Sequence, residues 1–374
     1  MSRVIEKTLP EGWLETTIEN SCEILDKLRK PISQKNRTNG EYPYYGATGI
    51  VDYINNYIFD ERLVLVGEDG AKWERGDKTG FIAEGKYWVN NHAHVLRVNE
   101  DILIDKWLVN FLCFSDLSDY ITGTTVPKLN QAKLKSIEFP LPPLKEQKRI
   151  VAKIDTLFAK IDKAISLTEN SLKQAENLLP SVLKDVFEKG KVEGWEEKKL
   201  TEICERIFAG GDKPKDYFSN TKTDECSIPI FSNGIKEDGL YGYTKEPKVI
   251  KPSVTISARG TIGHTVYRTE PFVPIVRLIV LTPNQEIVSA NFLMIVIKNL
   301  EILNVGSAIP QLTVPMIKNY SVLIPNQDNQ DKISDLVGIY ETKITQTQSK
   351  LEGQLAYLKQ LKSSILSKAF KGEL

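Results

Sequence analysis

The sequence predicts an α+β protein in which two similar mixed α/β domains are separated by two long antiparallel coiled-coil helices. Three observations lead to this prediction. The chain repeats itself, the first part of each repeat carries short strand-like runs between turns, and the second part carries a helical heptad pattern. At 374 residues, the chain also exceeds one ordinary hydrophobic core, so two or more domains are expected.

The internal repeat is visible as short matching segments in the same order. Glu11-Gly12-Trp13 recurs 182 residues later as Glu193-Gly194-Trp195, and the segment 125–129 (TVPKL) recurs 183 residues later as 308–312 (AIPQL). The segment 42–45 (YPYY) has a looser counterpart at 228–231 (IPIF). The 183-residue offset also aligns Ile150, Ile161, Leu172, Leu183 and Phe187 with Ile333, Ile344, Leu355, Leu366 and Phe370. Chance explains one such match but not an ordered series.

The first part of each repeat is predicted to be a mixed α/β domain, over residues 1–143 and 191–326. Both segments are rich in Gly, Pro, Tyr and β-branched residues, which is typical of short strands joined by turns. Strands are expected at 63–66, 87–89, 254–256 and 278–281, and one late helix per domain at 104–117 and 290–303.

The second part of each repeat is predicted to be one long helix, over residues 144–190 and 327–374. Apolar residues recur at alternating spacings of three and four, the pattern of a coiled-coil seam. Pro142-Pro143 and Pro325 precede the helices, Gly190 and Gly372 end them, and Pro180 predicts a kink in the first helix only. A helix with a narrow apolar seam needs a partner, so the second helix is expected to return along the first. About 45 residues at 1.5 Å each give a rod of roughly 65 Å.

The composition is that of a globular protein with no net charge. Lys+Arg and Asp+Glu both number 49, so any nucleic-acid surface must come from local clustering of positive charge. The four cysteines form no CxxC, which argues against a disulfide framework or a zinc finger and predicts a reducing cytoplasm. No apolar stretch is long enough to span a membrane, and the first residues show no signal-peptide core.

Two motifs resemble phosphate or metal sites, and neither is interpreted as one. The segment 80–86 (GFIAEGK) comes close to a P-loop, but Tyr87 stands where Ser or Thr would hold magnesium, and a strand follows where a helix is required. Asp77, Glu84 and Lys86 loosely match the metal site of many nucleases, and solvated turn residues are the favoured interpretation.

His92 and His94 are predicted to share one face of a strand. No third metal ligand stands nearby in sequence, so buried or hydrogen-bonding histidines are favoured, and contact with a DNA base edge stays open. No Asn/Asp-Pro-Pro-Tyr/Phe tetrapeptide, which would hold a flipped adenine, is present.

Two similar domains on a rigid spacer suit a ligand that itself repeats in space. Duplex DNA is one such ligand, since half-sites one helical turn apart lie about 34 Å from each other. The alternative from a different functional class is a non-DNA coiled-coil adaptor with twin binding domains.

Three segments are similar to the specificity subunits of type I restriction-modification systems. They are the junction 139–150 (FPLPPLKEQKRI), the opening Pro10-Glu11-Gly12-Trp13 and the tail 365–374 (ILSKAFKGEL). The resemblance covers the whole chain. It implies a non-catalytic subunit whose two target-recognition domains each read one half of a bipartite double-stranded DNA sequence, while the helices set the gap.

The resemblance also implies partners and cofactors. Two modification subunits, which methylate adenine with S-adenosylmethionine, would dock on this chain, and restriction subunits would add ATP- and Mg-dependent cleavage. No cofactor is expected on the chain itself. The docking candidates are Glu146, Gln147, Arg149, Gln330 and Lys332. Asn329 aligns with Glu146, so whether the two docking sites are equivalent stays open.

Basic and polar loops are the candidate DNA surface, because Arg, Lys and Asn read guanine and adenine edges and grip phosphates. In the first domain the candidates are Lys27, Arg29, Lys30, Lys35, Arg37, Asn39, Lys72 and Arg75. In the second domain they are Lys213, Lys215, Arg259 and Thr261.

Overall fold

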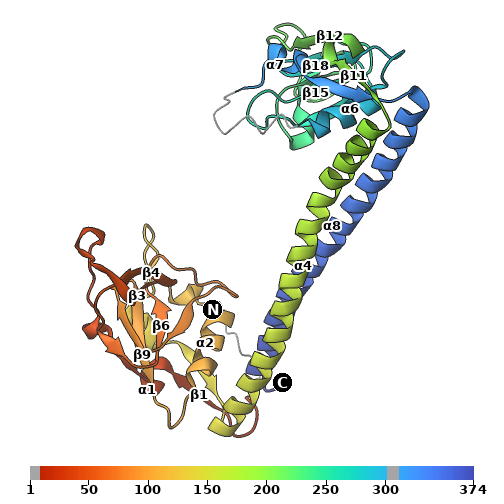
Figure 1. Cartoon of the computed structure of the whole chain (residues 1–374). Helices are drawn as coiled ribbons and strands as arrows, with labels where there is room; N and C mark the ends of the chain where they lie inside the picture. Colours follow the sequence, from red (N-terminus) through yellow and green to blue (C-terminus); the bar gives the residue numbers. More distant parts are fainter. Residues whose placement is uncertain (1–8, 301–310) are drawn as a thin grey trace. The chain divides into compact units, whose positions relative to one another are not determined.

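The computed structural model describes residues 9–300 and 311–374 (Figure 1). The chain forms two compact units. Unit 1 comprises Met1–Glu169 and Gly353–Leu374, and unit 2 comprises Asn170–Glu352. Each unit contains one mixed α/β domain and part of each long helix, and each is described by itself.

Unit 1 is built on an antiparallel sheet with the strand order β2-β9-β6-β7. Its strands are β2 (Cys22–Ile24), β6 (Leu63–Gly67), β7 (Gly80–Ala83) and β9 (Ala93–Val98). Strand β6 is buried throughout, as its uninterrupted apolar sequence predicts. Helix α2 (Asp105–Phe114) packs beside β6 and β7 with Trp107, Leu108 and Leu112 fully buried.

A second sheet in unit 1 has the order β4-β3-β8-β5, in which β3 runs antiparallel to β4 and parallel to β8. Its strands are β3 (Asn39–Gly46), β4 (Gly49–Ile54), β5 (Phe59–Asp60) and β8 (Lys86–Val89). The chain enters the domain through β1 (Leu14–Thr17) and leaves it through β10 (Glu138–Leu141), which pair with each other. The short helices α1 (Ile18–Ser21) and α3 (Gln131–Lys135) follow β1 and precede β10.

Unit 2 repeats this topology, except that β5 has no counterpart among the described strands. The sheet β12-β18-β15-β16 corresponds to β2-β9-β6-β7, the sheet β14-β13-β17 corresponds to β4-β3-β8, and β11 pairs with β19 as β1 does with β10. The strands are β11 (Glu196–Lys199), β12 (Cys204–Ala209), β13 (Ile228–Phe231), β14 (Leu240–Thr244), β15 (Ser253–Ile256), β16 (Thr265–Arg268), β17 (Val273–Pro274), β18 (Ile279–Pro283) and β19 (Ser321–Ile324). The helices are α5 (Leu200–Ile203), α6 (Ala290–Asn299) and α7 (Val314–Lys318).

The two long helices are α4 (Leu144–Val192) and α8 (Gln327–Phe370). Within unit 1 they run antiparallel, because Lys153 lies beside Leu374 while Asp162 pairs with Lys362. Ile150, Ile154 and Ile161 of α4 share one core with the last turns of α8. The predicted seam is therefore confirmed, and it continues into the domain core.

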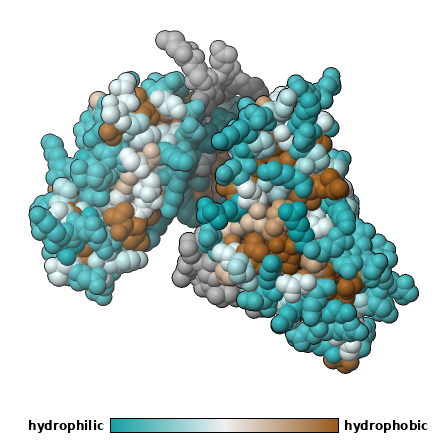
Figure 2. All heavy atoms as spheres, turned by 90° about the horizontal axis from the view of Figure 1, so that it is seen from above, coloured by the Kyte–Doolittle hydropathy of each residue, from teal (hydrophilic) through white to brown (hydrophobic). Residues whose placement is uncertain are grey.

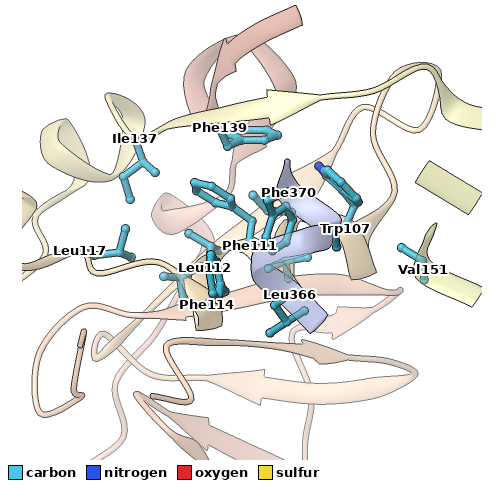
Figure 3. Close-up of a cluster of buried hydrophobic side chains, with 14 of the residues drawn as sticks. Trp107, Phe111, Leu112, Phe114, Leu117, Ile137, Phe139, Val151, Leu366 and Phe370 are labelled. Carbon is cyan, nitrogen blue, oxygen red and sulfur yellow. The ribbon is translucent and has the colours of Figure 1, made fainter. Parts of the chain in front are cut away.

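Phe370 connects the end of α8 to the first domain. Figure 3 shows its ring among Trp107, Phe111 and Phe114, with centroids 4.9, 5.4 and 5.5 Å away. In unit 2, Phe187 of α4 occupies the matching place, 6.0 Å from Trp195 and 6.3 Å from Phe292. Each domain core is thus completed by an aromatic residue from the end of a long helix.

The element predictions are mostly confirmed, and the differences lie at helix ends, including α8, which ends at Phe370 rather than at residue 374. Helix α4 ends at Val192 rather than Gly190, and the glycine with a positive φ beyond it is Gly194 (φ 75°). Pro180 lies inside helix α4, and the kink expected there stays a prediction. Helix α2 is shorter than the predicted 104–117, and the repeat match at 308–310 and the predicted helix residues 301–303 lie outside the described residues.

The surface of the molecule is mixed in character. In the face seen in Figure 2, hydrophobic side chains gather in small patches between hydrophilic ones. None of the described helices combines the length and the apolar character needed to cross a membrane.

Candidate functional site

Four loop segments meet beyond one end of the main sheet of unit 1. They are residues 26–30, 67–70, 90–92 and 128–130, and we call this set the loop junction of unit 1. Backbone hydrogen bonds fix it: Glu68 N–H donates to His92 O (2.8 Å), and Leu129 N–H donates to Glu68 O (2.8 Å). The junction is therefore a built feature of the domain, with side chains displayed from a rigid backbone.

A network of charged groups, buried except for the half-exposed Lys128, ties the loop junction of unit 1 together. His94 Nε2 donates to Leu129 O (2.7 Å), and its Nδ1 lies 2.6 Å from Asp26 Oδ2. Arg29 reaches Glu68 Oε2 (2.5 Å) and Asp26 Oδ2 (3.3 Å), and Lys128 Nζ lies 2.7 Å from Glu68 Oε1. All of these groups have a partner of opposite polarity, as buried charges require.

The electrostatics of the two carboxylates follow from these contacts. Burial pushes the pKa of Asp26 upward, but hydrogen bonds from His94, Gln131 and the Val95 amide hold it below its usual value. Burial likewise raises the pKa of Glu68, and Lys128 and Arg29 together lower it below its usual value. Both carboxylates are therefore stabilised in the ionised form.

Asp26, Glu68 and His94 place ligand atoms within 4.8 Å of one another, close enough to hold a metal ion. The cations Arg29 and Lys128 already neutralise both carboxylates, and the Nε2 of His94 is engaged by a carbonyl. The donor set is thus satisfied internally, and we interpret the cluster as a structural ion network.

Unit 2 forms the corresponding junction with different side chains. Leu312 N–H donates to Ala258 O (2.9 Å), which repeats the bond between Leu129 and Glu68. Arg259 donates from Nε (3.0 Å) and Nη2 (2.7 Å) to Gln311 Oε1. Asn233 holds the junction from the side, accepting from Ala258 N–H (2.7 Å) and donating to a neighbouring backbone carbonyl.

Beside this junction, Val276 and Arg277 both adopt positive φ angles, 51° and 63°. Non-glycine residues rarely adopt this conformation, and it is strained for a β-branched valine. Both side chains are exposed. Their backbone N–H groups donate to Gly211 and Gly210, which hold the strained conformation in place.

The candidate DNA residues of the first domain separate into exposed and internally engaged groups. Lys27, Lys30, Lys35, Asn39, Lys72 and Arg75 are exposed. The side chain of Arg29 is only 13% exposed and belongs to the ion network. Arg37 is half-buried, pairs with Asp52 (3.1 Å) and lies 4.5 Å over the Tyr44 ring. Arg29 and Arg37 thus already have structural roles.

In the second domain, Lys213, Lys215 and Arg259 are exposed, and Lys213 lies 3.7 Å over the Phe218 ring. The Thr261 hydroxyl is buried with no hydrogen-bond partner among the described residues. Sequence reasoning missed Gln311 and Lys128, although the 183-residue offset aligns the two and could have indicated them.

Of the docking candidates, Gln147 and Gln330 are completely buried and make matching internal contacts. Gln147 accepts from Ile104 N–H (2.9 Å) and donates to the carbonyls of Ile102 and Pro142 (both 2.8 Å). Gln330 accepts from Ser289 N–H (3.0 Å) and donates to the carbonyls at 287 and 325 (2.8 and 3.1 Å). These glutamines anchor each helix to its domain and do not lie on a surface that a partner would meet.

The remaining docking candidates are accessible. Arg149 and Lys332 are exposed, and Glu146 is half-buried and joined to Arg149 by two hydrogen bonds of 2.8 and 2.7 Å. That contact lowers the pKa of Glu146. The aligned Asn329 instead uses its backbone N–H to donate to the Asn326 side chain (3.1 Å). The two helix starts therefore differ in charge.

The P-loop-like segment, the nuclease-like trio and the histidine pair, which were singled out in the sequence, do not form phosphate or metal sites among the described residues. The P-loop-like segment forms β7, a turn at Gly85 and β8, without a helix. Glu84 pairs with Arg62, and Lys86 lies over the Tyr57 ring, so the nuclease-like trio is not assembled. The prediction that the two histidines share a strand face is wrong, since His92 precedes β9 and is exposed while His94 is buried.

Comparison with known proteins identifies the type of repeat. A family model described as the type I restriction modification DNA specificity domain matches residues 10–176 and again residues 192–355. A putative type I specificity subunit of Mycoplasma pneumoniae is 30% identical over 302 residues, covering 79% of this chain and 80% of the relative. A putative type I restriction enzyme specificity subunit of Haemophilus influenzae is 29% identical over 287 residues, covering 70% of each.

Two solved structures share the fold. A chain from a type I restriction-modification system, solved to describe complex assembly and conformational transition, has a TM-score of 0.78 at 21% identity and covers 98% of this chain and 100% of its own. The HsdS subunit of Thermoanaerobacter tengcongensis has a TM-score of 0.60 at 21% identity, with 99% of both chains covered.

Proposed function

We propose that this chain, which belongs to the type I restriction-modification DNA specificity family, uses its two DNA-recognition domains to read the two halves of a bipartite duplex target. The observation that carries the proposal is the matched pair of loop junctions. Both units share one backbone hydrogen bond of the junction, from Leu129 to Glu68 or from Leu312 to Ala258, and each displays a different set of polar side chains beside it. One scaffold with two side-chain sets suits a target with two different halves.

The proposal assigns no catalysis to this chain. Two modification subunits would carry S-adenosylmethionine and methylate adenine, and restriction subunits would use ATP and Mg, all in the cytoplasm. The exposed docking surface would lie at the start of each long helix, with Glu146 and Arg149 at one and Asn329 and Lys332 at the other. Because these starts differ in charge, the two modification subunits would bind with unequal affinity.

Co-expression with the modification subunit tests the assembly. The expected complex holds two modification subunits for each chain, and Glu146→Asn, which copies the second helix start, weakens one of the two docking events. Glu169→Asn, an exposed change elsewhere on α4, serves as the control. One modification subunit per wild-type chain, or none, contradicts two docking sites.

DNA binding by the assembled complex tests the reading function against the adaptor alternative. A complex that neutralises six to ten phosphates loses about 10³–10⁵ in affinity when the salt concentration rises from 50 to 200 mM. A steep salt response with methylation at a split sequence supports DNA reading. A coiled-coil adaptor would show neither, and that result would refute the proposal.

A further inference from the structure

One pair of side chains occupies the same place in both loop junctions. In unit 2 the pair is Arg259 and Gln311, and in unit 1 it is Asp69 and Lys128. The equivalence rests on backbone contacts, since each pair flanks the hydrogen bond from Leu129 to Glu68 or from Leu312 to Ala258. Asp69 and Lys128 also form a β-bridge with each other.

The guanidinium of Arg259 is held in advance of any ligand. Two of its five N–H groups, on Nε and Nη2, point at the single oxygen Oε1 of Gln311. Within residues 9–300 and 311–374, the remaining N–H groups, two on Nη1 and one on Nη2, have no hydrogen-bond acceptor, so they can donate to a ligand. Arg259 is exposed and stands beside Gly260, whose φ of 68° turns the loop sharply at this point.

Unit 1 offers different chemistry at this position. The carboxylate of Asp69 stands where Arg259 stands in unit 2, is engaged by Nδ1 of His92 and lies 3.8 Å from Lys128 Nζ. A carboxylate accepts hydrogen bonds and so cannot bind the two acceptors that guanine shows in the major groove. The junction of unit 1 therefore lacks the fork that unit 2 displays.

We propose that Arg259 reads a guanine in the half-target bound by unit 2, donating in parallel to its O6 and N7, and that Gln311 is the positioning residue that orients it. This inference rests on the proposed DNA-reading function. A planar fork held at a fixed angle matches the two guanine acceptors, which is the commonest specific contact between arginine and a base. A phosphate can also accept two parallel hydrogen bonds from arginine, but a phosphate contact would change overall affinity without changing the base required at one position.

The test uses the complex of the full chain with its modification subunits and maps methylated sites by sequencing. The variants are Arg259→Lys, which keeps the charge and loses the fork, Gln311→Ala, which loses the acceptor, and Gln311→Glu, which retains it. Arg206→Ala is the control, because Arg206 is another exposed arginine of unit 2, placed 4.0 Å over the Phe208 ring.

We expect the wild-type target to contain a required guanine in one half. The Arg259→Lys complex should no longer require this guanine, and its other half-target should be unchanged. Discrimination against the other three bases falls by about 5- to 150-fold, as expected for one bidentate contact. Gln311→Ala lowers discrimination in the same position, Gln311→Glu restores it, and Arg206→Ala leaves the target unchanged.

Other outcomes overturn the inference. If Arg259→Lys keeps the full discrimination for guanine, with or without weaker binding, the guanidinium fork does not read the base. If the relaxed position is not a guanine, the assigned base is wrong, and if Gln311→Ala matches wild type, Gln311 has no positioning role. A wild-type complex that methylates no split sequence instead refutes the proposed function itself.

Discussion

Replacement of Gln147 by leucine should destabilise unit 1 selectively. Leucine has a similar size but no polar atoms, so the Ile104 N–H and the carbonyls of Ile102 and Pro142 lose their partner inside the protein. Each orphaned buried group costs about 1–3 kcal/mol, which gives at least about 3 kcal/mol for the three. In a unit of this size, 1 kcal/mol shifts the melting temperature by about 2–4 °C, so a drop of about 6–12 °C is expected.

Tryptophan fluorescence can follow unit 1 alone. Trp195 is the only tryptophan of the sequence in unit 2, and the other four, Trp13, Trp73, Trp88 and Trp107, belong to unit 1. In a Trp195→Phe background, thermal unfolding therefore reports on unit 1.

The neighbouring exposed residue supplies the control, and the repeat supplies a second test. Lys148→Leu changes the same helix turn without burying or orphaning a polar group and should shift the melting temperature little. Gln330→Leu removes the matching contacts of unit 2 and should leave the unit 1 transition in place. If Gln147→Leu melts within about 1 °C of Lys148→Leu, well short of the expected shift, the glutamine does not anchor the helix and our account of the junction is wrong.

Three further perturbations test other parts of the molecule. Phe370→Ala should cost unit 1 about 3–5 kcal/mol by emptying its aromatic pocket, whereas Tyr357→Ala, at a residue 62% exposed, should cost little, and urea titration compares the two. The pKa values of Asp26 and Glu68 are lowered in the folded state, so the two carboxylates stabilise unit 1 above their usual pKa values near 4. This stabilisation is lost as the pH falls through their folded-state pKa values. The tryptophan fluorescence of unit 1 should show this acid transition, and Asp26→Asn should flatten it. A four-residue insertion at 168–172 lengthens α4 by about 6 Å. It should widen the gap in the methylated target by one or two base pairs while each half-sequence stays the same. An unchanged gap at normal activity would show that the helices do not set the spacing.

The fold could be predicted because its signals are local and occur twice. The spacing between apolar residues in the long helices alternates between three and four positions, which can be recognised from the sequence alone. The uninterrupted apolar run at β6 likewise identifies a buried strand. The end of α4 was misplaced by two residues because Gly190 and Gly194 are both plausible helix terminators. Only the structure shows that Gly190 stays helical, packed against Trp195, while Gly194 takes the positive φ.

The site could be predicted only in part, because the sequence does not show what surrounds a polar side chain. Gln147 stands in a run of charged residues, where a glutamine is ordinarily exposed, yet the tertiary fold places three backbone groups around it. Arg29 looks like any surface cation until Asp26 and Glu68 are seen to enclose it. Arg259 was found as a basic loop residue, but its pairing with Gln311 depends on two segments that are distant in the chain.

The discontinuity of unit 1 has a consequence for how the protein is made. Unit 2 is one uninterrupted stretch, Asn170–Glu352, and is synthesised before residues 353–374. Unit 1 still lacks residues 353–374 at that moment, so the pocket lined by Trp107 and Phe111 waits for Phe370 (Figure 3). At about 5–20 residues per second, synthesis of unit 2 alone takes about 10–40 s. The domain that is translated first is therefore completed last, and its open aromatic pocket is the surface that a chaperone would have to shield in the interval.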